Sequence, residues 1–243
     1  VADLVSKLPA PRVVWLMLPA GAATEDMIFG AGGLAELLQS GDTIIEGGNS
    51  YWEDDGPRAE KLKAKGIRYL DAGVSGGPAG ARHGACVMVG GEPAVFAELE
   101  QLFKDMARPD GYQHFAGVGA GHFVKMVHNG IEYGMMQAIG EGMEVLKVAP
   151  FNLNLKDVAR IYQNGSVIES RLVGWLQSGY EAYGTDLEKI SDVVAHSGEG
   201  EWTVKTARGL NVEVPIIEAS YQFRVQSKDH PRYANRVLSA LRN

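Results

Sequence analysis

Five polar side chains of different chemistry recur at helical spacing near the middle of the chain. They are Lys125, His128, Asn129, Glu132 and Tyr133, at positions i, i+3, i+4, i+7 and i+8. This spacing places all five on one face of an α-helix, which we call the polar face. Solvated outer faces usually repeat Lys, Glu, Gln and Ala, whereas here an amine, an imidazole, an amide, a carboxyl and a phenol each occur once. Taken alone, the pattern fits an outer face as well as it fits a site where a base and an acid act on one substrate.

Two glycine-rich loops follow short apolar runs upstream of this face. One is Val-Ser-Gly-Gly-Pro at 74–78, and the other is Glu-Gly-Gly-Asn-Ser at 46–50. Glycines allow backbone N–H groups to turn toward an anion, and Ser75 adds a hydroxyl donor. Ligands of open parallel sheets bind beyond the carboxyl ends of the strands, so both loops are candidate ligand loops. An ordinary strand-to-helix turn, and a helix cap at Asn49 or the next serine, explain the same residues equally simply.

The elements that must position these residues follow an α/β pattern. Strands alternating with helices predict a parallel sheet covered by helices, and the change to purely helical periodicity predicts a second, all-α domain. We therefore predict a Rossmann-like domain over 1–118 and an all-helical substrate and dimerisation domain over 119–243. The predicted strands are 13–18, 43–46, 67–71 and 85–89, and the predicted helices are 24–39, 52–65, 93–106, 120–147, 155–163, 166–180, 186–196, 201–209 and 215–242.

Composition limits the classes of function. The 243 residues are 45% hydrophobic and 22% charged, which suits a packed globular protein. The net charge of -7 argues against nucleic acid as the main partner. We expect no membrane span, because no apolar run of about 18 residues occurs, and no signal peptide is visible. Cys86 is the single cysteine, so no internal disulfide can form, which agrees with a reducing cytoplasm.

Three segments together resemble the decarboxylating 6-phosphogluconate dehydrogenase family. They are 46–50, 73–77 and the run Gly-Ala-Gly-His-Phe-Val-Lys-Met-Val-His-Asn-Gly-Ile-Glu-Tyr-Gly at 119–134. The last run is the most specific, and the Ser-Gly-Gly loop is shared with the wider β-hydroxyacid dehydrogenase group. The resemblance extends from about Val13 to Arg242. It implies oxidation of 6-phosphogluconate to ribulose 5-phosphate and CO2, with NAD or NADP as cofactor. The short helical half is similar to the mostly NAD-preferring form.

The resemblance also implies a role for each site residue. Lys125 is the base that takes the C3 hydroxyl proton, which requires an amine that is neutral at working pH. Glu132 then protonates C1 of the enediol, which requires a protonated carboxyl. Tyr133 and Arg224 bind the phosphate, since a guanidinium donates two parallel bonds. The remaining substrate contacts are Asn49, Ser75, Gly76, Gly77, His128 and Asn129, and the cofactor contacts are Leu18, Pro19, Ala20 and Asn49; no metal is implied.

The chain departs from the family pattern at three places. No Gly-x-Gly-x-x-Gly follows a strand-like run, and the glycines at 30–33 lie in a helix-loop stretch. Ser197 stands where the long forms carry a lysine, and the family's tail beyond Asn243 is not seen. We therefore expect a fragment with little or no dehydrogenase activity by itself. The family further implies a homodimer or higher homo-oligomer in the pentose phosphate pathway. Two alternatives stay open: a dehydrogenase of a small 3-hydroxy acid, and a non-catalytic sugar-phosphate-binding module.

Overall fold

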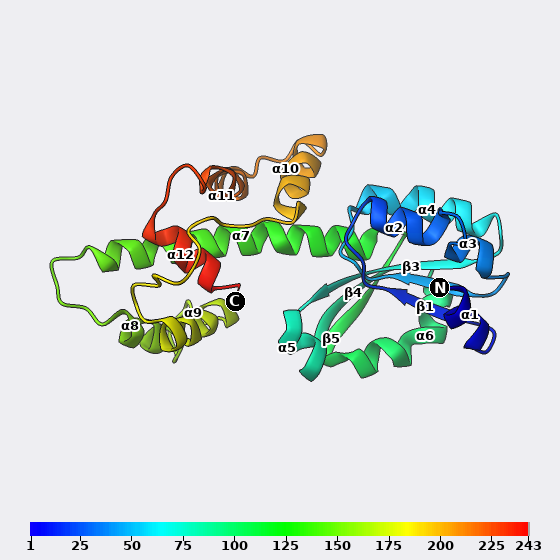
Figure 1. Ribbon diagram of the computed structural model, residues 1–243, viewed down its shortest axis with the longest axis horizontal. Helices are drawn as coiled ribbons and strands as arrows, with labels where there is room; N and C mark the ends of the chain where they lie inside the picture. Colours follow the sequence, from blue (N-terminus) through cyan, green and yellow to red (C-terminus); the bar gives the residue numbers. More distant parts are fainter. Residues whose placement is uncertain (243) are drawn as a thin grey trace. The chain divides into compact units, whose positions relative to one another are not determined.

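The computed structural model describes residues 1–242 and divides into two compact units (Figure 1). The first unit runs from Val1 to His128, and the second begins at Asn129. Both contain part of one helix, α7 (Ala120–Lys147). Asn243, the last residue of the predicted helical domain, lies outside the described residues.

The first unit is built on a five-stranded sheet in the order β1-β2-β3-β4-β5. β1, β2 and β3 are parallel neighbours, β4 is antiparallel to β3, and β5 is parallel to β4. The register pairs Leu16 with Glu46 and Glu46 with Asp71. The carboxyl ends of β1 and β2 therefore lie in one row with the middle of β3. The strands are β1 (Val13–Leu16), β2 (Thr43–Glu46), β3 (Arg68–Ser75), β4 (Ala85–Gly91) and β5 (Ala107–Ala116).

Helices cover both faces of this sheet (Figure 1). Successive strand residues face opposite sides, and both sides are apolar: fully buried Ile44 packs in one core cluster and fully buried Ile45 in the other. The Ile44 cluster includes Ile28 and Leu62 from the helices, and the Ile45 cluster includes Phe103. The helices are α1 (Ala2–Lys7), α2 (Ala22–Phe29), α3 (Leu34–Leu37), the 3₁₀ turn η1 (Trp52–Asp54), α4 (Asp55–Lys63), α5 (Gly77–His83) and α6 (Pro93–Met106).

The second unit is helical throughout its regular structure. Its core gathers apolar side chains from several helices, among them Met136, Leu176 and Leu238. Side-chain caps start two of the helices: Asn154 accepts a bond from the Lys156 N–H, and Ser170 accepts one from the Val173 N–H. The helices after α7 are α8 (Leu155–Tyr162), α9 (Arg171–Tyr183), α10 (Glu199–Gly209), α11 (Pro215–Gln226) and α12 (Tyr233–Ala240). No helix within residues 1–242 is long and apolar enough to span a membrane.

The predicted α/β arrangement followed by an all-α part is confirmed, and α7 has the predicted bounds. Several details were wrong: β4 breaks the parallel order, β5 was not predicted, and the loop predicted from residue 74 starts inside β3 and leads into α5. The segment 186–196 is not helical. Its buried Leu187, Ile190 and Val194 imitate helical spacing, but they fill the core from an irregular chain whose Val194 N–H donates to Ser227 Oγ.

Candidate active site

The first turns of α7 lie directly on the end of β3. Lys125 is 5% exposed. A Cβ atom on Gly73 would stand 2.3 Å from the Lys125 Cβ and 3.0 Å from the Gly121 carbonyl oxygen, so only glycine fits at this point of β3. Farther along, Ser75 Oγ lies 3.2 Å from His128 Nε2. The structure thus brings together Lys125, His128 and the serine of the predicted glycine loop.

The glycines after Ser75 turn the chain sharply out of the strand. Gly76 and Gly77 have φ values of 135° and 57°, a region that L side chains rarely adopt. A side chain on Gly76 would also meet the Gly80 Cα at 2.9 Å. Neither residue has a side chain that could cover the backbone at the end of β3. They can therefore present backbone to a ligand there.

Asn49 joins the tip of β2 to the tip of β3. Its Oδ1 accepts the Val74 N–H at 2.8 Å and its Nδ2 donates to the Val74 carbonyl at 3.2 Å, from a left-handed backbone with φ 57°. Each atom of an amide has capacity for one more hydrogen bond. Asn49 therefore has a structural role and keeps one donor and one acceptor for a ligand.

The loops after β1 and β2 pack closely against each other. Half-buried Leu18 and exposed Pro19 and Ala20 offer apolar surface beside the amide of Asn49. A Cβ on Gly48 would lie 2.3 Å from the Leu18 carbonyl oxygen, so glycine allows these two loops to pack closely. Within residues 1–242, no Gly-x-Gly-x-x-Gly follows a strand, and the glycines at 30–33 lie between α2 and α3. The described residues consequently supply no pyrophosphate turn of that type.

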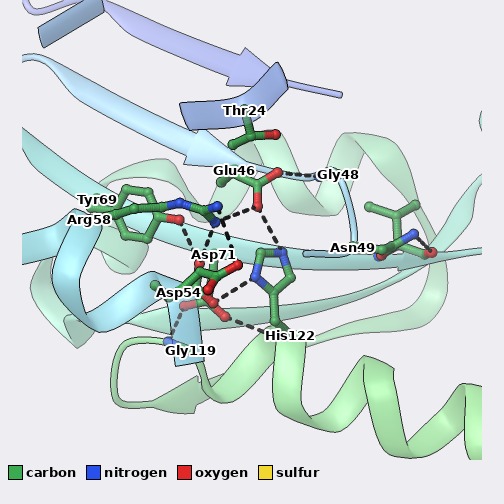
Figure 2. Close-up of polar contacts among 12 residues, drawn as sticks. Thr24, Glu46, Gly48, Asn49, Asp54, Arg58, Tyr69, Asp71, Gly119 and His122 are labelled. Atoms are coloured by element: carbon green, nitrogen blue, oxygen red, sulfur yellow. Dashed lines mark hydrogen bonds and ion pairs between the residues drawn. The ribbon is translucent and has the colours of Figure 1, made fainter. Parts of the chain in front are cut away.

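A buried group of charged residues lies under these loops, and the sequence reasoning did not identify it (Figure 2). We call Glu46, Asp55, Arg58, Asp71 and His122 the ionic network; each is at most 1% exposed. Its only sequence signals were a histidine one turn before Lys125 and acidic residues near strand ends. Those signals do not show that the side chains meet.

Two members of the ionic network have shifted pKa values. Burial, together with the charge of Asp55, raises the pKa of Asp71 to about 6, against the opposing effect of His122 and two backbone N–H donors. Burial by itself would lower the pKa of His122, but the hydrogen bond to Asp55 and the charges of Asp55, Asp71 and Glu46 raise it. Both groups therefore hold their protons more tightly than in the unfolded chain.

The second unit contains a buried guanidinium above an aromatic ring. Arg224 is 2% exposed, and its Cζ lies 3.7 Å from the centroid of the Tyr133 ring. It donates to the Ala195 carbonyl at 3.1 Å, while its Nε has no hydrogen-bond partner among the described residues. The charges of Glu132 and Glu199 favour its charged form, against the larger effect of burial. Burial lowers the pKa of Arg224 to about 10. A buried cation of this kind favours an anionic ligand.

Arg242 adds a second guanidinium to this group, and the sequence reasoning had not selected it. Its Nη1 donates at 2.5 Å to the same Ala195 carbonyl that Arg224 uses. The charge of Arg242 also contributes to lowering the pKa of Arg224, which places the two cations near each other. The Tyr133 ring packs directly on the backbone of Gly200, because a Cβ added to Gly200 would stand 2.4 Å from the ring. Asn129 is buried and Glu132 half-buried on the same helix.

A Rossmann-like sheet followed by a helical unit, with a buried lysine on the joining helix, defines the class of nicotinamide-dependent dehydrogenases with an all-α second domain. Residues 1–127 match the family described as the NAD binding domain of 6-phosphogluconate dehydrogenase, and residues 121–239 match the 6-phosphogluconate dehydrogenase C-terminal domain. The chain belongs to the 6-phosphogluconate dehydrogenase family.

Individual relatives support this membership. The chain is 42% identical to the NAD(+)-dependent, decarboxylating 6-phosphogluconate dehydrogenase of Haloferax volcanii, covering 100% of this chain and 79% of that protein. It is 38% identical to decarboxylating 6-phosphogluconate dehydrogenase 1 of Saccharomyces cerevisiae, again over 100% of this chain but only 48% of the yeast protein. The solved 6-phosphogluconate dehydrogenase of Plasmodium falciparum, studied with NADP+ and with 6-phosphogluconate, superposes with a TM-score of 0.81 at 30% identity, over 93% of this chain and 50% of that one.

Proposed function

We propose that this protein oxidises and decarboxylates 6-phosphogluconate to ribulose 5-phosphate. Its relatives' names state a decarboxylating 6-phosphogluconate dehydrogenase for those proteins. The observation that carries the proposal is the buried guanidinium of Arg224, which stacks on Tyr133 and shares the Ala195 carbonyl with a second guanidinium, that of Arg242. A phosphate monoester satisfies such a group with paired charge-assisted bonds. A small unphosphorylated hydroxy acid would offer it no such bonds.

The oxidation step needs a base at the C3 hydroxyl and a hydride acceptor. A bound NAD or NADP supplies the acceptor, and Leu18, Pro19, Ala20 and Asn49 would hold its nicotinamide end. Lys125 takes the hydroxyl proton. This role requires Lys125, which is 5% exposed, to be the neutral amine when the substrate binds.

Decarboxylation follows from the 3-keto product. The electron pair of the bond between the carboxylate and C2 moves to form the C2–C3 double bond, CO2 leaves, and negative charge develops on the C3 oxygen. Lys125, now protonated, donates a hydrogen bond to that oxygen. Glu132 then donates a proton to the enediol carbon that bore the carboxylate, which becomes C1 of ribulose 5-phosphate.

The other polar residues are assigned to substrate placement. Ser75 and His128, in contact at 3.2 Å, are assigned to the sugar hydroxyls together with Asn49 and Asn129. The backbone of Gly76 and Gly77 is assigned to the carboxylate end. Tyr133 and Arg224 are assigned to the phosphate, and Arg242 joins them because it shares the Ala195 carbonyl with Arg224.

Substrate comparison tests the proposal. Cofactor reduction and CO2 release are measured with 6-phosphogluconate, gluconate and 3-hydroxyisobutyrate, using NAD and NADP in separate assays. We expect kcat/KM for 6-phosphogluconate to exceed that for gluconate at least about 10²-fold, because two or more charge-assisted bonds to phosphate are lost. Preference for 3-hydroxyisobutyrate would identify a small 3-hydroxy acid as the substrate. Calorimetric binding of 6-phosphogluconate with no cofactor binding would identify a sugar-phosphate-binding module instead.

We also propose that the protein acts as a homodimer or higher homo-oligomer in the cytoplasm, where it would serve the pentose phosphate pathway. The second unit supports self-association, because large apolar side chains such as Val148, Phe151 and Val167 are exposed on it. An apolar cavity of about 610 Å³ opens among α7, α8 and α9 beside them. Light scattering after gel filtration would show a mass of at least twice 26.2 kDa, and a monomer would contradict the proposal.

A further inference from the structure

The ionic network connects elements that are far apart in the sequence. Arg58 Nη1 lies 3.5 Å from Glu46 Oε2 and 3.6 Å from Asp55 Oδ1, and His122 Nδ1 lies 2.7 Å from Asp55 Oδ2. Tyr69 donates its hydroxyl to Asp55 Oδ1 at 2.6 Å, and half-exposed Glu25 and Asp54 approach the outer side of Arg58. Five charged residues from β2, α4, β3 and α7 therefore meet with almost no water contact.

One part of this network anchors the start of α7. Asp71 Oδ1 accepts the Gly119 N–H at 2.7 Å, and its Oδ2 accepts the His122 N–H at 2.9 Å. The first N–H groups of a helix have no partner within the helix, so this carboxylate fixes both the position and the rotation of the first turn. His122 adds a third attachment through Asp55. Lys125 follows His122 by one helical turn.

Another part of the network shapes the loop that contains Asn49. Glu46 Oε1 accepts the Gly48 N–H at 2.7 Å, immediately before Asn49. Glu46 Oε2 lies 3.7 Å from His122 Nε2. One carboxylate side chain thus contacts both the loop after β2 and the helix that carries Lys125.

Metal binding does not explain this cluster. Glu46, Asp55 and His122 can bring three ligand atoms within 4.8 Å of one another. Arg58 already places a positive charge against both of those carboxylates, and the cluster is closed to solvent. Buried ion pairs add little net stability compared with apolar packing, so the benefit of such a cluster lies in fixed geometry. Geometry is what a base and its substrate loop require.

We propose that the ionic network holds α7 and the loop after β2 as one rigid body, so that Asp71 and His122 are positioning residues that place Lys125 against Ser75 and Asn49. This inference rests on the proposed function of Lys125. Asp71 and His122 touch neither substrate nor cofactor in this scheme. They act through the helix whose first turn they hold.

The test compares two buried aspartates of the first unit. Asp42 is 1% exposed and accepts two backbone N–H bonds, from Arg12 at 2.7 Å and Gln39 at 3.0 Å, as Asp71 does from Gly119 and His122. Asp42 precedes β2 at the opposite end of the strand from Glu46. Asp71→Asn and Asp42→Asn therefore both change a buried carboxylate that accepts two backbone N–H bonds. Asp42 also pairs with Arg12 Nη1 at 3.2 Å, and only Asp71 lies beside α7.

We expect Asp71→Asn to lower kcat about 10²-fold, since a displacement near 1 Å at a reacting group has that effect. Asp42→Asn should lower the melting temperature, because it breaks the pair with Arg12, and should leave kcat within about twofold. Equal losses of kcat in both variants, or an unchanged kcat in Asp71→Asn, would overturn the proposal. If Asp71→Asn does not fold, His122→Asn, which keeps an N–H donor for Asp55, is compared with His122→Leu. Higher kcat in His122→Asn is expected, and equal values contradict the proposal.

Amide hydrogen exchange separates this inference from the proposed function. In Asp71→Asn, faster exchange should extend from the first turn of α7 through Lys125 to His128. Faster exchange restricted to Gly119 and His122 would overturn the positioning role. If the unsubstituted protein fails to turn over 6-phosphogluconate, the proposed function fails. The exchange pattern still decides whether the network holds the helix.

Discussion

Gly73→Ala is the substitution whose effect the structure defines most directly. Its Cβ would stand 2.3 Å from the Lys125 Cβ, 2.9 Å from the Lys125 Cγ and 3.0 Å from the Gly121 carbonyl oxygen. Two carbon atoms in ordinary contact are separated by about 3.5 Å or more. α7 and β3 must therefore separate locally by about 1 Å.

Neither side of this contact can give way cheaply. Gly121 on α7 packs against β4, because a Cβ added to Gly121 would lie 2.4 Å from the Met88 carbonyl oxygen. The start of the helix is also hydrogen-bonded to Asp71. The Lys125 clash is at its Cβ, so a change of side-chain rotamer does not relieve it. Overpacking of this kind costs about 1–3 kcal/mol of stability. Misplacing the base by about 1 Å costs about 10²-fold in kcat.

The assay compares Gly73→Ala with Gly56→Ala. A Cβ on Gly56 in α4 meets nothing within 4 Å, and alanine there favours the helix. Cofactor reduction with 6-phosphogluconate gives kcat and KM, and calorimetry gives the melting temperature. We expect a loss of about 10²-fold in kcat for Gly73→Ala and none for Gly56→Ala. Full kcat in a Gly73→Ala protein that melts like the parent would refute the assignment of Lys125 as a closely positioned base.

Three further predictions follow from the site. Lys125→Met should lower kcat by about 10²–10⁴-fold with less than tenfold change in the calorimetric affinity for 6-phosphogluconate; a kcat within tenfold of the parent's would contradict its role as base. Arg224→Met should raise KM for 6-phosphogluconate about 10–10²-fold and leave turnover of gluconate unchanged, because only the phosphate contact is lost; equal effects on both substrates argue against a phosphate site. Burial raises the pKa of Asp71 from 3.8 to about 6. The shift corresponds to a loss of about 3 kcal/mol in the free energy of unfolding when this carboxyl ionises. The folded state binds that proton more tightly, so the free energy of unfolding should fall as pH rises from about 4 to 6, and His122, whose raised pKa acts in the same direction, should extend the fall above pH 6.5. Denaturant titrations between pH 4 and 8 measure this, and Asp71→Asn should remove the lower part of the fall.

The sequence predicted α7 well because local physics determines it. Polar and apolar residues alternate with the same helical period throughout the 28 residues of α7, and the helix has the predicted bounds. The loop after β2 was also found where it lies, whereas only Gly76 of the predicted loop 74–78 lies between β3 and α5. Periodicity and turn chemistry are local properties, so these features needed no knowledge of the tertiary structure.

The features that the sequence did not predict depend on pairing between distant segments. β5 (Ala107–Ala116) contains Arg-Pro-Asp-Gly, which breaks strand periodicity, and β4 supplies the partner that makes it a strand. The ionic network could not be foreseen either, because 67 residues separate Asp55 from His122 and each looks like an ordinary charged residue. Arg242 was missed for the same reason, since only the fold brings it to the carbonyl of Ala195.

Placing the base and the acid on one helix has a geometric consequence. Lys125 and Glu132 are seven residues apart, which is two turns and about 10 Å along the axis. Side chains on a helix lean toward its N-terminus, so Glu132 extends back toward the turn of Lys125, with Asn129 between them. The two steps that they are proposed to catalyse concern adjacent carbons, C3 and C2 of 6-phosphogluconate. A continuous helix fixes this separation more tightly than two loops would, and the attachments of its first turn to Asp71 and Asp55 set where Lys125 acts.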